Sequence, residues 1–243
     1  MAIFDVLDDT NRGMTGEYGQ LNVYDDTLNK YVLLLPLETL PSVVGSTNTV
    51  DNDVTTSRVI GKIKGKKTID DKDITFLWHR DNIERLNEFV GKQCDFLVSY
   101  KDGTGWKFSG EITYRNDDGS ASDKLTGTLT IIASDVDDIA TSNVLDMMAK
   151  TCVITNNNFP SEVVLEKSTG EGKTSTKDVT VKFSNATATC DVTSDNTAIT
   201  ATYTSGKIAI STTSTTETTG IVKVVPKASG EASWTQYILV VVK

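Results

Sequence analysis

In the first half of the chain, hydrophobic and polar residues alternate through several short stretches, which is the pattern of half-buried β-strands. Trp106, Phe108, Ile112 and Tyr114 are spaced by even numbers and therefore share one face of a strand. The same pattern predicts strands at 20–24, 30–35, 57–66, 74–78, 96–100 and 125–132. We expect the strands 57–66 and 74–78 to pair across a turn at Asp70 and Asp71.

A short helix is predicted over residues 81–91. Asp81 is a suitable N-cap, Glu84 follows it at capping-box spacing, and Gly91 suits the position after the last turn. The apolar residues of this segment fall on one helical face: Ile83, Leu86, Phe89 and Val90. A second helix is indicated over residues 134–150.

Two polar segments separate these elements. Residues 42–56 are rich in Ser, Thr, Asn and Asp and predict a long surface loop. Loops of this length are usually functional or disordered. Residues 151–159 are Asn-rich and predict a linker. We therefore expect a first domain at residues 1–150 and a second at residues 160–243.

The second domain has almost no helical pattern. Short strands recur at the spacing of a β-sandwich, at 162–166, 178–183, 188–192, 198–203, 207–211, 220–225 and 236–242. Seven such strands predict an immunoglobulin-like sandwich, although the Cys…Trp…Cys pattern of antibody domains is absent. The expected fold class is mainly β: a sandwich- or barrel-forming domain with one short flanking helix, followed by an Ig-like sandwich.

The charge is unevenly distributed. Residues 1–150 hold 16 Lys/Arg and 25 Asp/Glu, a balance of −9, whereas residues 151–243 hold 8 of each. This balance argues against a nucleic-acid-binding protein, which needs a basic surface. No apolar run approaches the roughly 20 residues of a membrane span, and the acidic start of the chain does not resemble a secretory signal.

The residues that could carry chemistry are few. His79 is the only histidine, so any Ser–His–Asp or Cys–His arrangement would have to use it, and no GxSxG motif is present. Cys94, Cys152 and Cys190 are widely spaced and are expected to be reduced, packed thiols. One histidine and three scattered cysteines do not make a zinc site. We expect no catalytic, cofactor-binding or metal-binding residues and no enzymatic activity.

Two further patterns are weaker. Residues 168–174 (STGEGKT) resemble part of a phosphate-binding loop, but Lys167 stands where the motif requires glycine and a strand is predicted to follow. Acidic clusters lie at 8–9, 25–26, 70–73, 117–118 and 135–138. Most of them fall at predicted turns or at a helix start, where Asp is favoured for backbone reasons, although a collective electrostatic role is also open.

The order of elements resembles the major tail tube proteins of long-tailed bacteriophages. The segment SRVIGKIKGKKTIDDKDITFLWHRDNIERLNEFVGKQ (57–93) is similar to the strand–turn–strand–helix centre of that family. The segment WKFSGEITYRNDDGSASDKLTGTLTI (106–131) is similar to its closing strands. The segment VTSDNTAITATYTSGKIAISTTSTTETTGIVKVV (192–225) resembles the bacterial Ig-like domains that lambda-like phages append to this subunit. The resemblance covers about residues 15–133 and 160–243, and it is one of pattern.

The resemblance implies a structural subunit that polymerises as stacked hexameric rings around an acidic channel, through which DNA passes without specific binding. The loop at 38–56 would reach the neighbouring ring, and the helix at 81–91 would pack outside the barrel. The Ig-like domain would project from the surface, with host glycans as candidate ligands. Tail tip, tail terminator and tape measure proteins would be partners. The subunit would belong to the virion tail, with no membrane association, and would assemble in the cytoplasm of the host bacterium.

Three other interpretations stay open. The chain could form the inner tube of a contractile tail or tailocin, although a close-fitting sheath leaves little room for an appended domain. It could be a bacterial surface adhesin or carbohydrate-binding Ig-like protein, which would need an export signal. A hydrolase with two acidic residues would need an aromatic-lined pocket, and the three tryptophans are scattered in the sequence.

Overall fold

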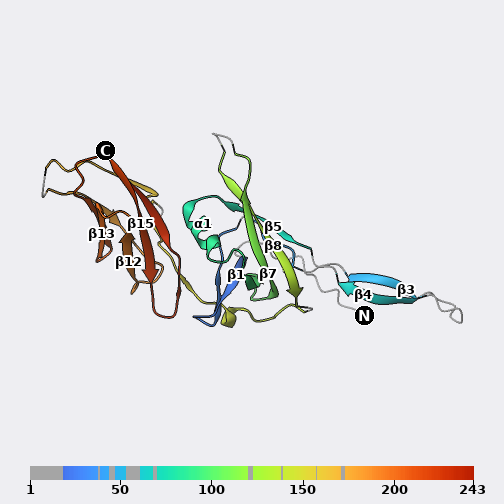
Figure 1. Ribbon diagram of the computed structural model, residues 1–243. Coiled ribbons are helices and arrows are strands. Elements are labelled where there is room, and N and C mark those ends of the chain that lie inside the picture. Colours follow the sequence, from blue (N-terminus) through green and yellow to red (C-terminus); the bar gives the residue numbers. More distant parts are fainter. Residues whose placement is uncertain are drawn as a thin grey trace, which may run out of the picture. The chain divides into compact units, whose positions relative to one another are not determined.

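The structure is a computed structural model of the 243-residue chain (Figure 1). It describes residues 19–37, 39–43, 47–52, 61–67, 70–119, 123–137, 139–156, 158–170 and 173–243, with the backbone alone described in 47–52 and 61–67. The described part is mainly β with one short α-helix, so the predicted fold class is confirmed.

Contacts divide the chain into two compact units, each of which is described by itself. The first contains Leu33–Trp78 and Phe89–Met147 together with residues up to Tyr24. The second contains Asp25–Val32, His79–Glu88 and Met148–Lys243. The domain boundaries expected from the sequence stay predictions.

A six-stranded sheet has the strand order β2-β1-β6-β7-β8-β5, and its strands other than β2 make up the centre of the first unit. The strands are β1 (Gln20–Asp25), β2 (Lys30–Leu33), β5 (Lys72–Leu77), β6 (Gln93–Ser99), β7 (Gly105–Asn116) and β8 (Thr126–Val136). Strand β7 pairs antiparallel with β6 along one side and with β8 along the other. All six strands lie at or near predicted positions, which confirms the alternation as their signal.

One face of this sheet is the core of the unit. Its fully buried residues come from alternate positions of five strands: Leu21, Val23, Ile74, Phe76, Phe96, Val98, Ile112, Leu129 and Ile131. Phe96 stacks on Phe108 with ring centroids 5.2 Å apart, and Phe76 contacts both Trp78 and Tyr114 at 6.0 and 6.4 Å. The Phe96–Phe108 pair joins the neighbouring strands β6 and β7, and the Phe76–Tyr114 contact reaches from β5 to β7 across β8. These contacts add to the stabilisation from buried area.

The predicted helix at 134–150 is wrong. Strand β8 continues to Val136 through a β-bulge, because Gly110 pairs with Ala133 while Ser109 pairs with Asp135. The chain then runs back along β7, where Thr141 and Gly105 exchange two backbone hydrogen bonds of 2.8 and 2.9 Å. Those bonds occupy backbone groups that a helix would need. Among the described residues of 134–150, only the 3-10 turn Leu145–Met147 is helical.

The predicted helix at 81–91 exists but is shorter. Helix α1 (Arg80–Asn87) has His79 at its N-cap position, without a side-chain capping bond. Asp81 lies in the first turn and not at the cap. Gly91 does adopt a positive φ of 72°, the conformation that favours glycine, in the turn after the helix.

The long loop predicted at 38–56 contains a strand. Strand β3 (Thr47–Asn52) pairs antiparallel with β4 (Gly61–Lys67) as a hairpin, shown in Figure 1. The expected pairing of the strands near 57–66 and 74–78 is therefore wrong, since β5 pairs with β8 instead. The polar composition of β3 hid it, because β-propensity scales favour apolar and β-branched residues.

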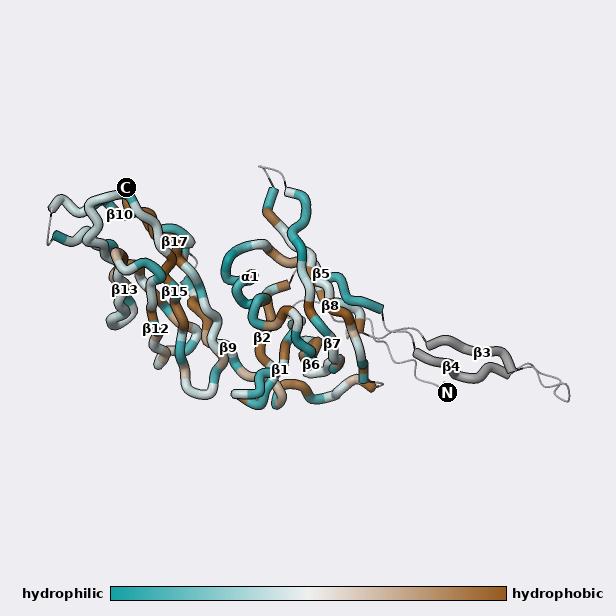
Figure 2. The backbone as a smooth tube through the Cα atoms, in the orientation of Figure 1, coloured by the Kyte–Doolittle hydropathy of each residue, from teal (hydrophilic) through white to brown (hydrophobic). Residues whose placement is uncertain are grey.

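The second unit is built on a β-sandwich. A four-stranded sheet has the order β10-β17-β15-β12, and a three-stranded sheet has the order β11-β14-β13. The strands are β10 (Glu162–Leu165), β11 (Ser175–Thr180), β12 (Thr189–Ser194), β13 (Ile199–Thr204), β14 (Lys207–Thr212), β15 (Thr218–Lys227) and β17 (Gln236–Val242). All seven predicted strands are confirmed within a few residues of their bounds, and Figure 2 shows the apolar stretches of β15 and β17.

The core of the sandwich contains small β-branched and aliphatic residues from both sheets. Ile208, Ile210, Val222, Val224, Ile238 and Val240 are fully buried. The many Ser and Thr residues of this unit occupy the alternate, outward positions, as in β13, where Thr200, Thr202 and Thr204 are exposed. The high Ser and Thr content of this unit therefore belongs to the exposed faces of strands and not to a disordered segment.

Residues 151–159, expected to be a linker, carry regular structure. Strand β9 (Thr151–Cys152) pairs in parallel with β16 (Ala232–Ser233), and Ile154 forms a bridge with Phe183. Cys152 has no solvent exposure. This segment is thus hydrogen-bonded to the sandwich along most of its length.

Gly127 gives a test of the packing in the sheet. It pairs with Phe76 on β5, and a Cβ atom there would lie 2.7 Å from both the Phe76 and Trp78 rings and 2.9 Å from the Arg115 carbonyl oxygen. We expect Gly127→Ala to lower the free energy of unfolding by about 1–3 kcal/mol. Thermal and urea unfolding measure it. Gly170→Ala, which meets nothing within 4 Å, is the control and should be neutral; equal effects would contradict the packing argument.

Candidate functional site

The second face of the six-stranded sheet is polar along β5, β7 and β8. We call the following residues the polar face: Asp73, Thr75, Leu77, Glu111, Thr113, Arg115, Thr126, Thr128, Thr130 and Ile132. All of them are exposed or half-buried, because strand alternation turns them away from the buried face. The polar face holds two carboxylates and one guanidinium, so its own charge is slightly negative.

Hydrogen bonds between neighbouring strands fix the side chains of the polar face. The Thr130 hydroxyl donates to Asp73 Oδ1 at 2.6 Å. The hydroxyls of Thr128 and Thr126 donate to the two carboxylate oxygens of Asp117, at 2.7 and 3.1 Å. These bonds hold the threonines and carboxylates in place. The result is an ordered, hydroxyl-rich β surface.

Sequence reasoning did not single out the threonines of this face. Their signal was present in the segment 126–130, where Thr alternates with Gly and Leu. The alternation predicts the strand and its two faces. It does not show that Asp117, beyond the end of β7, lies within reach of Thr128.

The two edge strands of the sheet are β2 and β5. Each makes one isolated bridge on its outer side, Tyr31 with Met148 and Leu37 with Phe76. The outer side of an edge strand can offer backbone groups to a further strand.

The hairpin β3–β4 contrasts in charge with the rest of the first 150 residues. Strand β4 contains four lysines and no acidic residue, and β3 contains only Asp51. Without these four lysines, residues 1–150 hold 12 Lys/Arg and 25 Asp/Glu. The register pairs Lys62 with Asp51, Lys64 with Thr49 and, after a one-residue shift, Lys67 with Thr47.

The acidic clusters lie mostly at strand ends, as expected for turn residues. Asp25 Oδ1 accepts the backbone N–H groups of Thr27 and Leu28 at 2.8 and 3.1 Å, which closes the turn between β1 and β2. Asp102 Oδ1 accepts both the amide and the hydroxyl of Thr104, and these bonds lower the pKa of that carboxyl. The clusters at 8–9 and at position 138 lie outside the described residues.

His79 is placed at the start of α1, with its Nδ1 atom 4.0 Å from Asp81 Oδ2. Its side chain is about half exposed. Among the described residues, no group of three or more His, Cys, Asp or Glu side chains could hold a metal ion. No described helix has the length and apolar character needed to span a membrane.

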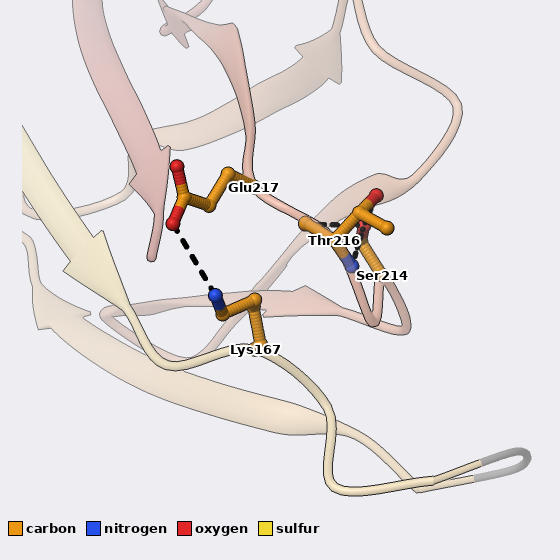
Figure 3. A network of polar contacts seen from close by, with 4 residues as sticks. All are labelled: Lys167, Ser214, Thr216 and Glu217. Carbon is orange, nitrogen blue, oxygen red and sulfur yellow. Dashed lines mark hydrogen bonds and ion pairs between the residues drawn. The ribbon is translucent and has the colours of Figure 1, made fainter.

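The segment 168–174, which resembles part of a phosphate-binding loop, is held by hydrogen bonds within the segment. The Ser168 hydroxyl donates to the carbonyl oxygens of Gly170 and Lys173, at 2.9 and 2.7 Å. Lys167 forms an exposed ion pair with Glu217 at 3.3 Å, next to the Ser214 and Thr216 turn (Figure 3). Strand β11 follows at Ser175, which confirms that no helix begins there. A phosphate loop needs that helix for its anion site.

The three cysteines differ in exposure. Cys152 and Cys190 are buried and Cys94 is intermediate, and none is in a disulfide. Burial raises the pKa of the Cys152 thiol, and burial with the nearby Asp191 carboxylate raises that of Cys190 to about 11. The thiols at these two positions are therefore held in their unreactive, protonated form.

Helix α1 contacts the C-terminal part of the second unit through Asp81. Asp81 Oδ1 accepts the backbone N–H of Tyr237, near the start of β17, at 3.1 Å. Residues of α1 and of the segment 233–237 line a common hollow: Asp81, Glu84, Arg85, Glu88, Ser233, Trp234, Thr235 and Tyr237. Burial raises the pKa of Asp81, against the opposing effects of His79, the Tyr237 amide and Arg80.

No protein-family model matches this sequence, and no curated protein matches it. A chain in the 6-fold symmetrised cryo-EM structure of the anti-feeding prophage baseplate is structurally similar, with a TM-score of 0.36 and 9% sequence identity. The alignment covers 55% of this chain and 97% of that chain.

The raised pKa of Asp81 predicts a pH dependence. A carboxyl whose pKa is higher in the folded state binds its proton more tightly in that state. Its stabilising contribution is therefore complete at pH values below the pKa of the unfolded state, and it is lost as the pH rises through the pKa of the folded state. Relative to Asp81→Asn, the wild type should therefore be less stable at about pH 7 than at about pH 4. Urea unfolding of both proteins at both pH values measures this. A wild type that gains stability over the variant as pH rises would contradict it.

Proposed function

We propose that this chain is a non-enzymatic structural subunit of a phage tail tube. Its subunits would form hexameric rings that stack around a channel, with the polar face of the sheet lining that channel. The polar face is the observation that carries the proposal. It is an ordered β surface of hydroxyls and a few charges, which suits contact with a moving hydrated polymer better than it suits tight binding.

The chemistry of the polar face supports the passage of DNA without binding. Threonine hydroxyls are turned to carboxylates of the chain, which leaves fewer donors for a phosphate group. Asp73 and Glu111 repel phosphates, and Arg115 offsets part of that repulsion. At physiological salt such repulsion acts within about 8–10 Å of the wall. A lining of this kind keeps DNA hydrated and mobile.

The edges of the sheet support ring formation. Strands β2 and β5 would face the corresponding edges of neighbouring subunits, so that six sheets join into one closed wall. Closing a sheet removes its exposed edges, which are otherwise sites of aggregation. A head-to-tail contact between identical subunits forms a ring when the rotation from each subunit to the next leads back to the first subunit.

The hairpin β3–β4 supports the stacking of rings. Its strand β3 lies in the segment 38–56 that is expected to reach a neighbouring ring. The four lysines of β4 oppose the excess of carboxylates in the rest of the first 150 residues. A basic hairpin that enters an acidic surface of another copy would gain from charge complementarity, and it would lose that gain in high salt.

The second unit would supply a surface-exposed, Ig-like sandwich. Its lack of net charge in residues 151–243 is consistent with an environment that differs from that of the channel. Partners would be further copies of the chain and the tail tip, terminator and tape measure proteins, and the subunit would belong to the virion tail. Host surface glycans are the proposed ligand class of the sandwich.

Negative-stain electron microscopy of the purified protein at near-physiological salt tests the proposal. Rings or hollow tubes are the expected result. If the protein is monomeric, it is mixed with a tail-tip complex as an initiator. Protein that stays monomeric under both conditions would reject the tube proposal in favour of a surface adhesin.

Charge reversal in the hairpin separates stacking from ring formation. We expect Lys62→Glu/Lys64→Glu/Lys67→Glu to leave rings intact and to reduce tube length at least several-fold, because like charges would then meet. The matched control is Lys177→Glu/Lys182→Glu/Lys223→Glu, which changes three exposed lysines of the second unit. Tube length by electron microscopy and sedimentation is the measurement. Equal tube lengths in the two variants would exclude the hairpin as the stacking contact.

A further inference from the structure

The second unit is assembled from separate parts of the chain. The sandwich belongs to Met148–Lys243, but His79–Glu88 and Asp25–Val32 are in the same compact unit. A domain tethered only through its linker would not include a helix that lies about 60 residues earlier in sequence. The contacts that include this helix therefore need an explanation.

The first part of the attachment is backbone pairing. The Ala149 N–H donates to the Tyr31 carbonyl oxygen at 2.8 Å, and the Ala232 N–H donates to that of Lys150 at 2.8 Å. The Trp234 N–H then donates to the Cys152 carbonyl oxygen at 3.1 Å. This pairing brings the segment 232–234 into register just before β17 begins.

The second part is the contact between α1 and the start of β17. Asp81 presents its carboxylate from the first turn of the helix and accepts the Tyr237 amide hydrogen. Burial and the carboxylates of Glu84, Glu88 and Asp81 raise the pKa of the Tyr237 phenol, and Arg80 acts against them. The neighbouring Trp234 is 92% buried, with a relative exposure of 8%.

From these contacts we infer that helix α1 is the docking element of the C-terminal sandwich. Asp81 holds the start of β17 to the helix through the Tyr237 amide. The sandwich is thereby fixed to α1 as well as joined through residues 148–160, and its release requires this hydrogen bond to break. The partner is a segment of the same chain, and the inference is independent of whether the protein forms a tube.

Amide hydrogen exchange of the full-length protein, followed by NMR or by mass spectrometry of overlapping peptides, tests this docking contact. The Tyr237 amide should be protected in the wild type. Asp81→Ala removes the acceptor and should speed exchange at Tyr237 by roughly tenfold, since a hydrogen bond to a charged group contributes about that factor. Asp81→Asn keeps an acceptor oxygen and should retain most of the protection. Asp178→Ala removes an exposed carboxylate of β11 and is the control.

The amides of Val222 and Val224, in the centre of β15, report on the sandwich as a whole. Faster exchange at Tyr237 with unchanged protection at these two residues supports the docking role. Unchanged exchange at Tyr237 in Asp81→Ala overturns it. If Asp81→Ala exposes the whole sandwich, the inference stands only when Asp81→Asn preserves protection at Tyr237, and it fails when Asp81→Asn does not.

Discussion

The strict two-residue period of the β-strand is the constraint on which the first unit depends. Once Phe76, Ile112 and Leu129 are committed to one face of the sheet, their sequence neighbours must lie on the other. The apolar face gains stability from burial, and the opposite face receives whatever the alternate positions contain. Here those positions hold threonines and a few charged residues, so the core and the polar face are two results of one pattern. A one-residue slip of β5, β7 or β8 would exchange them.

The strand β7 shows how this constraint extends across the sheet. It is twelve residues long and pairs with both β6 and β8, so it sets the register of its neighbours on each side. Gly105 and Gly110 on this strand leave room for Val144 and for the β8 backbone, respectively. The bulge opposite Gly110 then allows β8 to bend without breaking the ladder. Aromatic contacts between Phe96 and Phe108 add side-chain specificity to the backbone pairing.

Local pattern predicted most of the elements but not their partners. The strands at 20–25 and 105–116 were found because apolar residues alternate within them. The partner of β5 was not, because pairing depends on tertiary contacts that a sequence pattern does not contain. The false helix at 134–150 had acceptable helical spacing, yet hydrogen bonds between Thr141 and Gly105 determined its backbone. The Asp81 contact was missed for a related reason: a carboxylate in the first turn of a helix predicts a cap, whereas its partner lies 156 residues away.

The arrangement of the thiols has a practical consequence for spectroscopy. Cys152 on β9 and Cys190 in the sandwich core are buried and held as thiols, whereas Cys94 lies on β6 with partial exposure. A maleimide dye or spin label added to the folded chain should therefore react at one position in the first unit, without removal of the other cysteines. Because the structure around Cys152 or Cys190 must open before either thiol can react, the rate at which a second label appears would measure how often such opening occurs.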